Sequence, residues 1–146
     1  MELIRALVLV TLCLGCVEPS QMARMCEAAS LLAGAIEESE SAASMIAVAP
    51  SDNPKRHLDR ALAANEGALD RIESINDQDF RSDDLWRRLR GTSVTVSSVI
   101  ERLRKGQHEA GRSLIGDARK ELNSLVPPLP RACLGGVGVE SPDASP

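Results

Sequence analysis

Apolar residues recur at alternating three- and four-residue intervals through most of this chain, a spacing that places them on one face of an α-helix. Four segments show the pattern. We call the positions that repeat at this spacing the seam of each helix. They are Met22, Met25, Ala29, Leu32, Ile36, Ser39, Ala43 and Ile46; Leu58, Leu62, Asn65, Leu69 and Ile72; Leu85, Leu89, Thr92, Val96, Val99 and Leu103; and Gly111, Leu114, Ala118, Leu122 and Leu125, with Ile115 beside them. Each helix has one stripe to bury, so the chain is predicted to be all-α.

Proline and glycine mark where these helices begin and end. Pro50 ends the first helix, and Pro54 suits the first position of the second. Gly106 is placed to end the third, and the prolines at 127–128 end the fourth. Because the connections are short, we expect an up-down-up-down four-helix bundle.

The stretch 92–99, TSVTVSSV, is rich in β-branched residues and taken alone is typical of a strand. The helical seam nevertheless continues through it in register, and a single strand would have no partner elsewhere in the chain. We therefore expect a helix here.

The first sixteen residues have the pattern of an export signal. Arg5 precedes an apolar run at 6–14, which is shorter than the roughly 20 residues that span a bilayer. The run ends in LCLGC, at 12–16, which resembles the lipobox of bacterial lipoprotein precursors, although Cys13 stands where that family usually has leucine. The resemblance implies that a signal peptide, residues 1–15, precedes a lipidated N-terminal Cys16.

Two alternatives to the lipoprotein interpretation remain: an ordinary cleaved signal peptide and an uncleaved anchor. The segment Val17–Ser20 lacks a small-x-small cleavage site, which favours the lipobox. If Cys16 carries more than one acyl chain, membrane attachment is stable.

Cleavage before Cys16 and lipid on its sulfur leave Cys26 and Cys133 as the remaining cysteines. In an oxidising compartment, such a pair is most simply a disulfide. An up-down-up-down bundle also brings the start of the first helix and the end of the fourth to the same end. Metal binding is the alternative, but the only CxxC spacing lies in the leader, at residues 13–16, and HxxxH and ExxH spacings are absent from the sequence.

Composition limits the classes of function. Seventeen basic and 21 acidic residues give a net charge of −4, which argues against a nucleic-acid partner. One Phe, one Trp and no Tyr leave little to stack on bases or sugars. We expect residues 16–21 to be a tether, 22–126 the four-helix bundle and 127–146 a Pro/Gly/Ser-rich tail, disordered except where Cys133 holds it.

The segment from Leu85 to Leu125, with its Lys-Gly turn at 105–106, resembles the periplasmic four-helix b-type cytochromes. Those proteins hold haem between a methionine near the start of the first helix and a histidine near the end of the fourth. Met22 or Met25 matches the first ligand, but the fourth helix lacks the histidine, and His108 lies at its opposite end. The resemblance supports the fold and argues against haem, so we expect no cofactor.

Basic and aromatic residues gather near the start of the third helix. The candidates for contact with a partner are Phe80, Trp86, Arg87, Arg88 and Arg90. An aromatic residue beside arginines is a typical composition for a binding hot spot. The strip suits an acidic partner or anionic lipid headgroups. The alternative is that the arginines form salt bridges to neighbouring helices.

Other polar groups lack the spacing that chemistry requires. The glutamates at 37–40 are without Glu-x-x-His pairs, so they indicate a solvated face rather than a di-iron site. Asn65, Thr92 and Ser39 interrupt the seams and either fix the register or line a ligand cavity. No serine or cysteine stands in a motif with a base, so we expect no enzyme.

We therefore predict a lipid-anchored binding or adaptor module of the cell envelope, with its bundle outside the cytoplasm on the periplasmic side. Its expected partners are the membrane, through the lipid, and an envelope protein, with no nucleic acid. The alternative is a cytochrome-like bundle that carries haem, a metal or a small apolar molecule.

Overall fold

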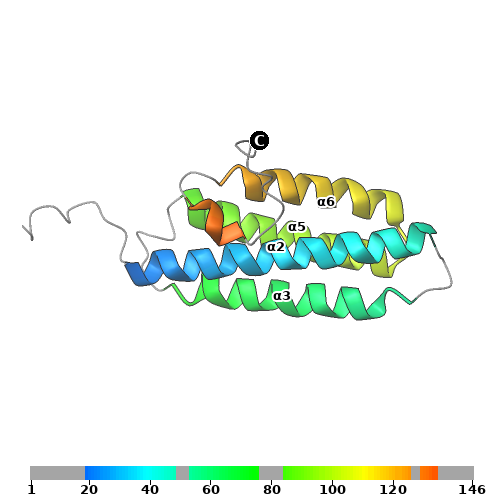
Figure 1. Cartoon of the computed structure of the whole chain (residues 1–146), viewed down its shortest axis with the longest axis horizontal. Helices are drawn as coiled ribbons and strands as arrows, with labels where there is room; N and C mark the ends of the chain where they lie inside the picture. Colours follow the sequence, from blue (N-terminus) through cyan, green and yellow to red (C-terminus); the bar gives the residue numbers. More distant parts are fainter. Residues whose placement is uncertain (1–18, 49–52, 76–83, 126–128, 135–146) are drawn as a thin grey trace, which may run out of the picture.

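The computed structural model describes residues 19–48, 53–75, 84–125 and 129–134. They form the α-helices α2 (Pro19–Val48), α3 (Lys55–Glu73), α5 (Asp84–Arg104) and α6 (His108–Asn123), and the 3-10 turn η1 (Arg131–Leu134). The helices run up, down, up and down, with α3 and α6 on opposite sides of α2 and α5 (Figure 1). The predicted all-α four-helix bundle is confirmed. Its first helix begins at Pro19, inside the segment expected to be a tether.

The long helix α2 is the centre of the bundle, because it contacts α3, α5, α6 and η1. Its buried surface is rich in alanine: Ala28, Ala35 and Ala42 are fully buried and recur every seven residues. Ala61 and Ala68 on α3 are also fully buried. Small side chains on both helices allow a close approach of their backbones. Among the described helices, α2 and α3 pack against each other most extensively.

This alanine packing changes the predicted seam of the second helix. Leu62 and Leu69 were expected on the seam but are only half-buried, whereas Ala61 and Ala68 take the central positions. On α6, likewise, the buried residue is Ile115 rather than its neighbour at 114. The leucines flank the contact because the space between α2 and α3 admits only small side chains.

The interior polar residues bond to one another and to the backbone. Asn65 Nδ2 donates to Ser97 Oγ at 2.8 Å, and Ser93 Oγ donates to Asn65 Oδ1 at 2.9 Å. Thr92 Oγ1 donates to the Arg88 carbonyl oxygen at 2.9 Å. These bonds satisfy buried polar groups, and those of Asn65 tie α3 to α5. They also lie in the β-branched stretch, which is helical as predicted.

The reversal from α5 to α6 depends on Gly106, whose φ of +75° is one that L side chains rarely adopt. The Gly106 N–H donates to the Leu103 carbonyl at 3.1 Å, and the Gln107 N–H donates to the Arg102 carbonyl at 2.9 Å. This pair of bonds is the Schellman motif. The predicted helix end at Gly106 is confirmed, and α6 begins two residues later.

After α6 the chain folds back onto the first helix. The Leu129 N–H donates to the Leu125 carbonyl at 2.8 Å, both leucines are buried, and η1 packs against α2. Cys133 in η1 is bonded to Cys26 in α2, with 4.8 Å between their Cα atoms. The structure thus contains the disulfide that the sequence predicts, at the end of the bundle where topology placed it.

Candidate functional site

Several predicted functional residues lie outside the described part of the chain. They include the leader with Cys16, Phe80 and the tail beyond residue 134. None of the described helices is both long enough and apolar enough to cross a membrane.

Trp86, the central residue of the predicted contact strip, is half-buried against the core. Its Nε1–H donates to the carbonyl oxygen of Ile72 at 3.0 Å, which joins α5 to the end of α3. The guanidinium of Arg90 lies 6.0 Å from the centroid of the indole ring, the outer limit of a cation–π contact. Trp86 therefore packs α5 against α3 and exposes only part of its ring.

The arginines of the strip do not share one face. Arg88 points to α6, where its Nε donates to Glu121 Oε1 at 2.7 Å, and it also donates to Ser124 Oγ. The hydrogen bond to Glu121 raises the pKa of Arg88 above its ordinary value. Arg87, by contrast, is 64% exposed and lies 3.8 Å from Asp84.

The strip predicted from the sequence is thus divided, and the salt-bridge alternative holds for Arg88. The sequence contains a signal that Arg88 lies beside the core. Position 88 lies three residues after Leu85 and four before Thr92, so both seam spacings place Arg88 at the edge of the buried face. Arg87 and Arg90 remain exposed at the start of α5.

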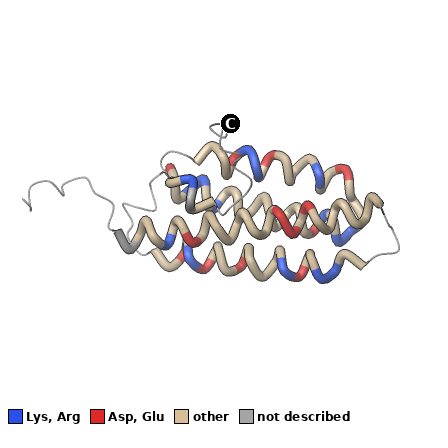
Figure 2. The backbone as a smooth tube through the Cα atoms, viewed as in Figure 1, with Lys and Arg blue, Asp and Glu red and all other residues tan. Residues whose placement is uncertain are grey.

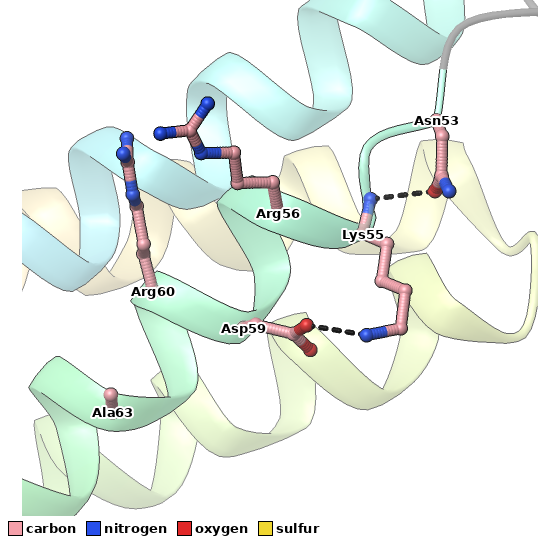
Figure 3. A pocket seen from close by; sticks show the side chains of 6 residues that line it. All are labelled: Asn53, Lys55, Arg56, Asp59, Arg60 and Ala63. Atoms are coloured by element: carbon pink, nitrogen blue, oxygen red, sulfur yellow. Dashed lines mark hydrogen bonds and ion pairs between the residues drawn. The ribbon is translucent and has the colours of Figure 1, made fainter.

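The structure reveals an open hollow at the start of α3 that the sequence did not indicate. Its volume is about 620 Å³, and it is lined by Asn53, Lys55, Arg56, Asp59, Arg60 and Ala63 (Figure 3). The Lys55 backbone N–H donates to Asn53 Oδ1 at 3.0 Å, across the N-cap residue Pro54. The side chains of Arg56 and Arg60 extend to the same side, whereas Lys55 turns toward Asp59.

Two carboxylates, Asp59 and Glu38, pair with the basic side chains around this hollow. Asp59 accepts from Lys55 Nζ at 2.7 Å and from Arg104 Nη2 at 3.0 Å, which joins α3 to the end of α5. The hydrogen bond from Lys55, with a smaller contribution from Arg104, lowers the pKa of Asp59 below its ordinary value of 3.8. Glu38 on α2 lies 3.7 Å from Arg60 and 2.5 Å from Nδ1 of His57.

A second hollow, of about 290 Å³, lies at the end of α5. Its lining residues are Ser98, Glu101, Arg102, Lys105 and Gln107. Lys105 Nζ donates to Glu101 Oε1 at 2.5 Å, and this hydrogen bond lowers the pKa of Glu101. Arg102 donates to the neutral amide of Gln107 at 3.2 Å.

Together these residues form one charged surface at the end of the bundle where α2 ends and α3 begins. We call it the distal basic surface. It consists of Lys55, Arg56, Arg60, Arg102, Arg104 and Lys105, with the carboxylates Glu38, Asp59 and Glu101 among them. Figure 2 colours the positions of basic residues blue at the corresponding ends of α3 and α5. The ion pair between Arg104 and Asp59 makes the surface continuous between the two helices.

The geometry bears on metal and haem binding as well. Within the described ranges, no three His, Cys, Asp or Glu side chains come together as a metal site. Met25 is buried near the start of α2, whereas His108 begins α6 at the distal end. The 16 residues of α6 span about 24 Å, so these two residues do not face one iron. Comparison of the chain with known protein families, characterised proteins and solved structures gives no match.

Proposed function

We propose that this protein is a lipid-anchored binding or adaptor module of the cell envelope, without catalytic activity. The lipobox-like residues 12–16 support the anchor. Two residues, Val17 and Glu18, lie between Cys16 and the first residue of α2. A lipid on Cys16 therefore holds the start of α2 close to the membrane.

The observation that carries the binding role is that the polar residues on the buried faces of the helices are bonded within the bundle. The buried polar residues Ser39, Thr92 and Asn65 each bond to another group of the protein. A ligand carrier of the cytochrome type would instead need inward groups left for its ligand. Recognition by this module therefore falls on its surface.

The length of α2 sets how far that surface stands from the membrane. Its 30 residues correspond to about 45 Å of helix. If α2 rises from the lipid anchor, the distal end of the bundle reaches away from the bilayer toward other envelope components. This geometry suits a tethered adaptor.

The test is quantitative cross-linking in intact envelopes, followed by purification of the tagged full-length protein. We expect one stoichiometric protein partner with the wild-type chain, and its loss or marked weakening in Cys16→Ala. The matched control is Cys13→Leu, which also removes a cysteine but restores the residue usual in a lipobox. An empty purification from correctly localised, folded wild-type protein would contradict the adaptor role.

A further inference from the structure

We propose that the distal basic surface is a docking site for an acidic segment of a protein partner. This inference rests on the proposed function, because the anchor at the start of α2 determines which end of the bundle is presented. The surface carries six cations and three carboxylates, whereas the other described residues include nine Lys and Arg and ten Asp and Glu. The charges are thus segregated, and an acidic partner is attracted to this end of the molecule.

Two arginines of the surface are available to a partner. Within the described residues, Arg56 makes no ion pair, and Arg102 bonds only to the neutral amide of Gln107. Lys55 and Arg104 differ, because Asp59 holds both of them in place. Asp59 thus holds Lys55 and Arg104, whereas the side chains of Arg56 and Arg102 form no ion pair with another described residue.

The spacing of two arginines at the hollow favours separate carboxylate side chains as the bound groups. Arg56 and Arg60 extend to the same side of α3 (Figure 3) and are four residues apart. Such positions lie about 5–6 Å from each other at their Cβ atoms. Two glutamates one turn apart on a helix of the partner have the same spacing, and Arg forms paired hydrogen bonds with carboxylates.

The carboxylates within the surface argue for a protein rather than a membrane or a phosphate polymer. Asp59 lines the hollow on α3, and Glu101 lines the hollow on α5. A continuous layer or chain of phosphates would be brought against both of these negative groups. An acidic protein segment can place its carboxylates beside the arginines and neutral side chains beside Asp59 and Glu101.

The test measures binding of a helical peptide with glutamates four residues apart to the full-length protein in a neutral detergent. In the double variant Arg56→Glu/Arg102→Glu, we expect the dissociation constant to rise about tenfold or more. The matched control is Lys120→Glu/Arg131→Glu, which makes the same change of charge at exposed cations near the opposite end. The control is expected to bind as wild type does, and added salt to weaken binding.

Three results would overturn the proposal. They are no binding of the glutamate peptide at low salt, an equal loss of binding in the two double variants, and stronger binding of polyphosphate than of the peptide. Stronger binding of phosphatidylglycerol vesicles, measured without detergent on the unlipidated Cys16→Ala variant, would also overturn it. Circular dichroism establishes that each variant is folded. Cys16→Ala is expected to bind the peptide normally, because the lipid takes no part in the contact. A failure of anchoring therefore bears on the proposed function alone.

Discussion

Cys26 on α2 and Cys133 on η1 are joined by a disulfide across a sequence separation of 107 residues. The bond fixes the segment after the last helix to the first helix of the bundle. In the chain-entropy model, a cross-link over a loop of this length lowers the entropy of the unfolded chain by the equivalent of about 4–5 kcal/mol.

Replacing both cysteines, as Cys26→Ala/Cys133→Ala, is therefore expected to lower the free energy of unfolding by about 4 kcal/mol. Urea titration followed by circular dichroism measures the change. A reducing agent should destabilise the wild-type protein and leave the double variant unaffected. Equal stability of the two proteins under oxidising conditions would show that the cross-link does not hold the fold.

The two glycines of α6 are expected to respond oppositely to replacement by alanine. A Cβ atom at Gly111 would lie 2.7 Å from Cδ2 and 3.0 Å from Cγ of Leu103, whereas a Cβ at Gly116 meets nothing within 4 Å. Leu103 is buried and has little room to move. Gly111→Ala should cost about 1–3 kcal/mol by overpacking, and Gly116→Ala should add about 0.5–1 kcal/mol through helix propensity.

Thermal unfolding of these two variants beside wild type checks this prediction. Because both substitutions lie in the same helix, propensity alone would raise both melting temperatures. A stabilised Gly111→Ala would mean that α5 and α6 are not in the close contact described.

The alanine packing between α2 and α3 is tested by enlarging one of its residues. Ala61 is fully buried, and Ala63, two residues later, is exposed. Ala61→Leu is expected to destabilise the protein by about 1–3 kcal/mol, because the close approach of the helices leaves no space for a leucine. Ala63→Leu is the control, with an expected change within about 0.5 kcal/mol. Similar urea midpoints for both variants would show that α2 and α3 are not closely packed at Ala61.

The ion pairs of Asp59 predict a loss of stability in acid. Because the pKa of Asp59 is lower in the folded protein than its ordinary value of 3.8, its contribution is present above that value and is lost as the pH falls through the folded pKa. Asp59→Asn should remove part of this dependence. Urea titrations at pH 7 and pH 3 measure it, with the exposed Asp70→Asn as control. The prediction fails if Asp59→Asn and wild type lose equal stability between the two pH values.

Much of the fold follows from the sequence because its determinants are local. The seams specify helices, and Gly106 supplies the conformation that the turn between α5 and α6 requires. Cys26 and Cys133 then meet because an even number of antiparallel helices returns the chain to its starting end.

The remaining features depend on how neighbouring helices face each other, which one helical pattern does not specify. Steps of three and four residues both stay on one face of a helix. The choice of Ala61 over Leu62 was therefore decided by the alanines of α2. The distal basic surface likewise escaped prediction, because it joins Asp59 on α3 to Arg104, 45 residues later in the sequence. The seam spacing places Arg88 at the edge of the buried face, but it does not identify its partner Glu121, which lies on another helix.

The most direct test of the account is the intact mass of the mature protein isolated from membranes of the cells that produce it. We predict a chain that begins at Cys16 and carries more than one acyl chain, and a Cys16→Ala variant without this modification. A mature chain that begins at another residue, or that retains residues 1–15 and carries no lipid, would contradict the anchored module.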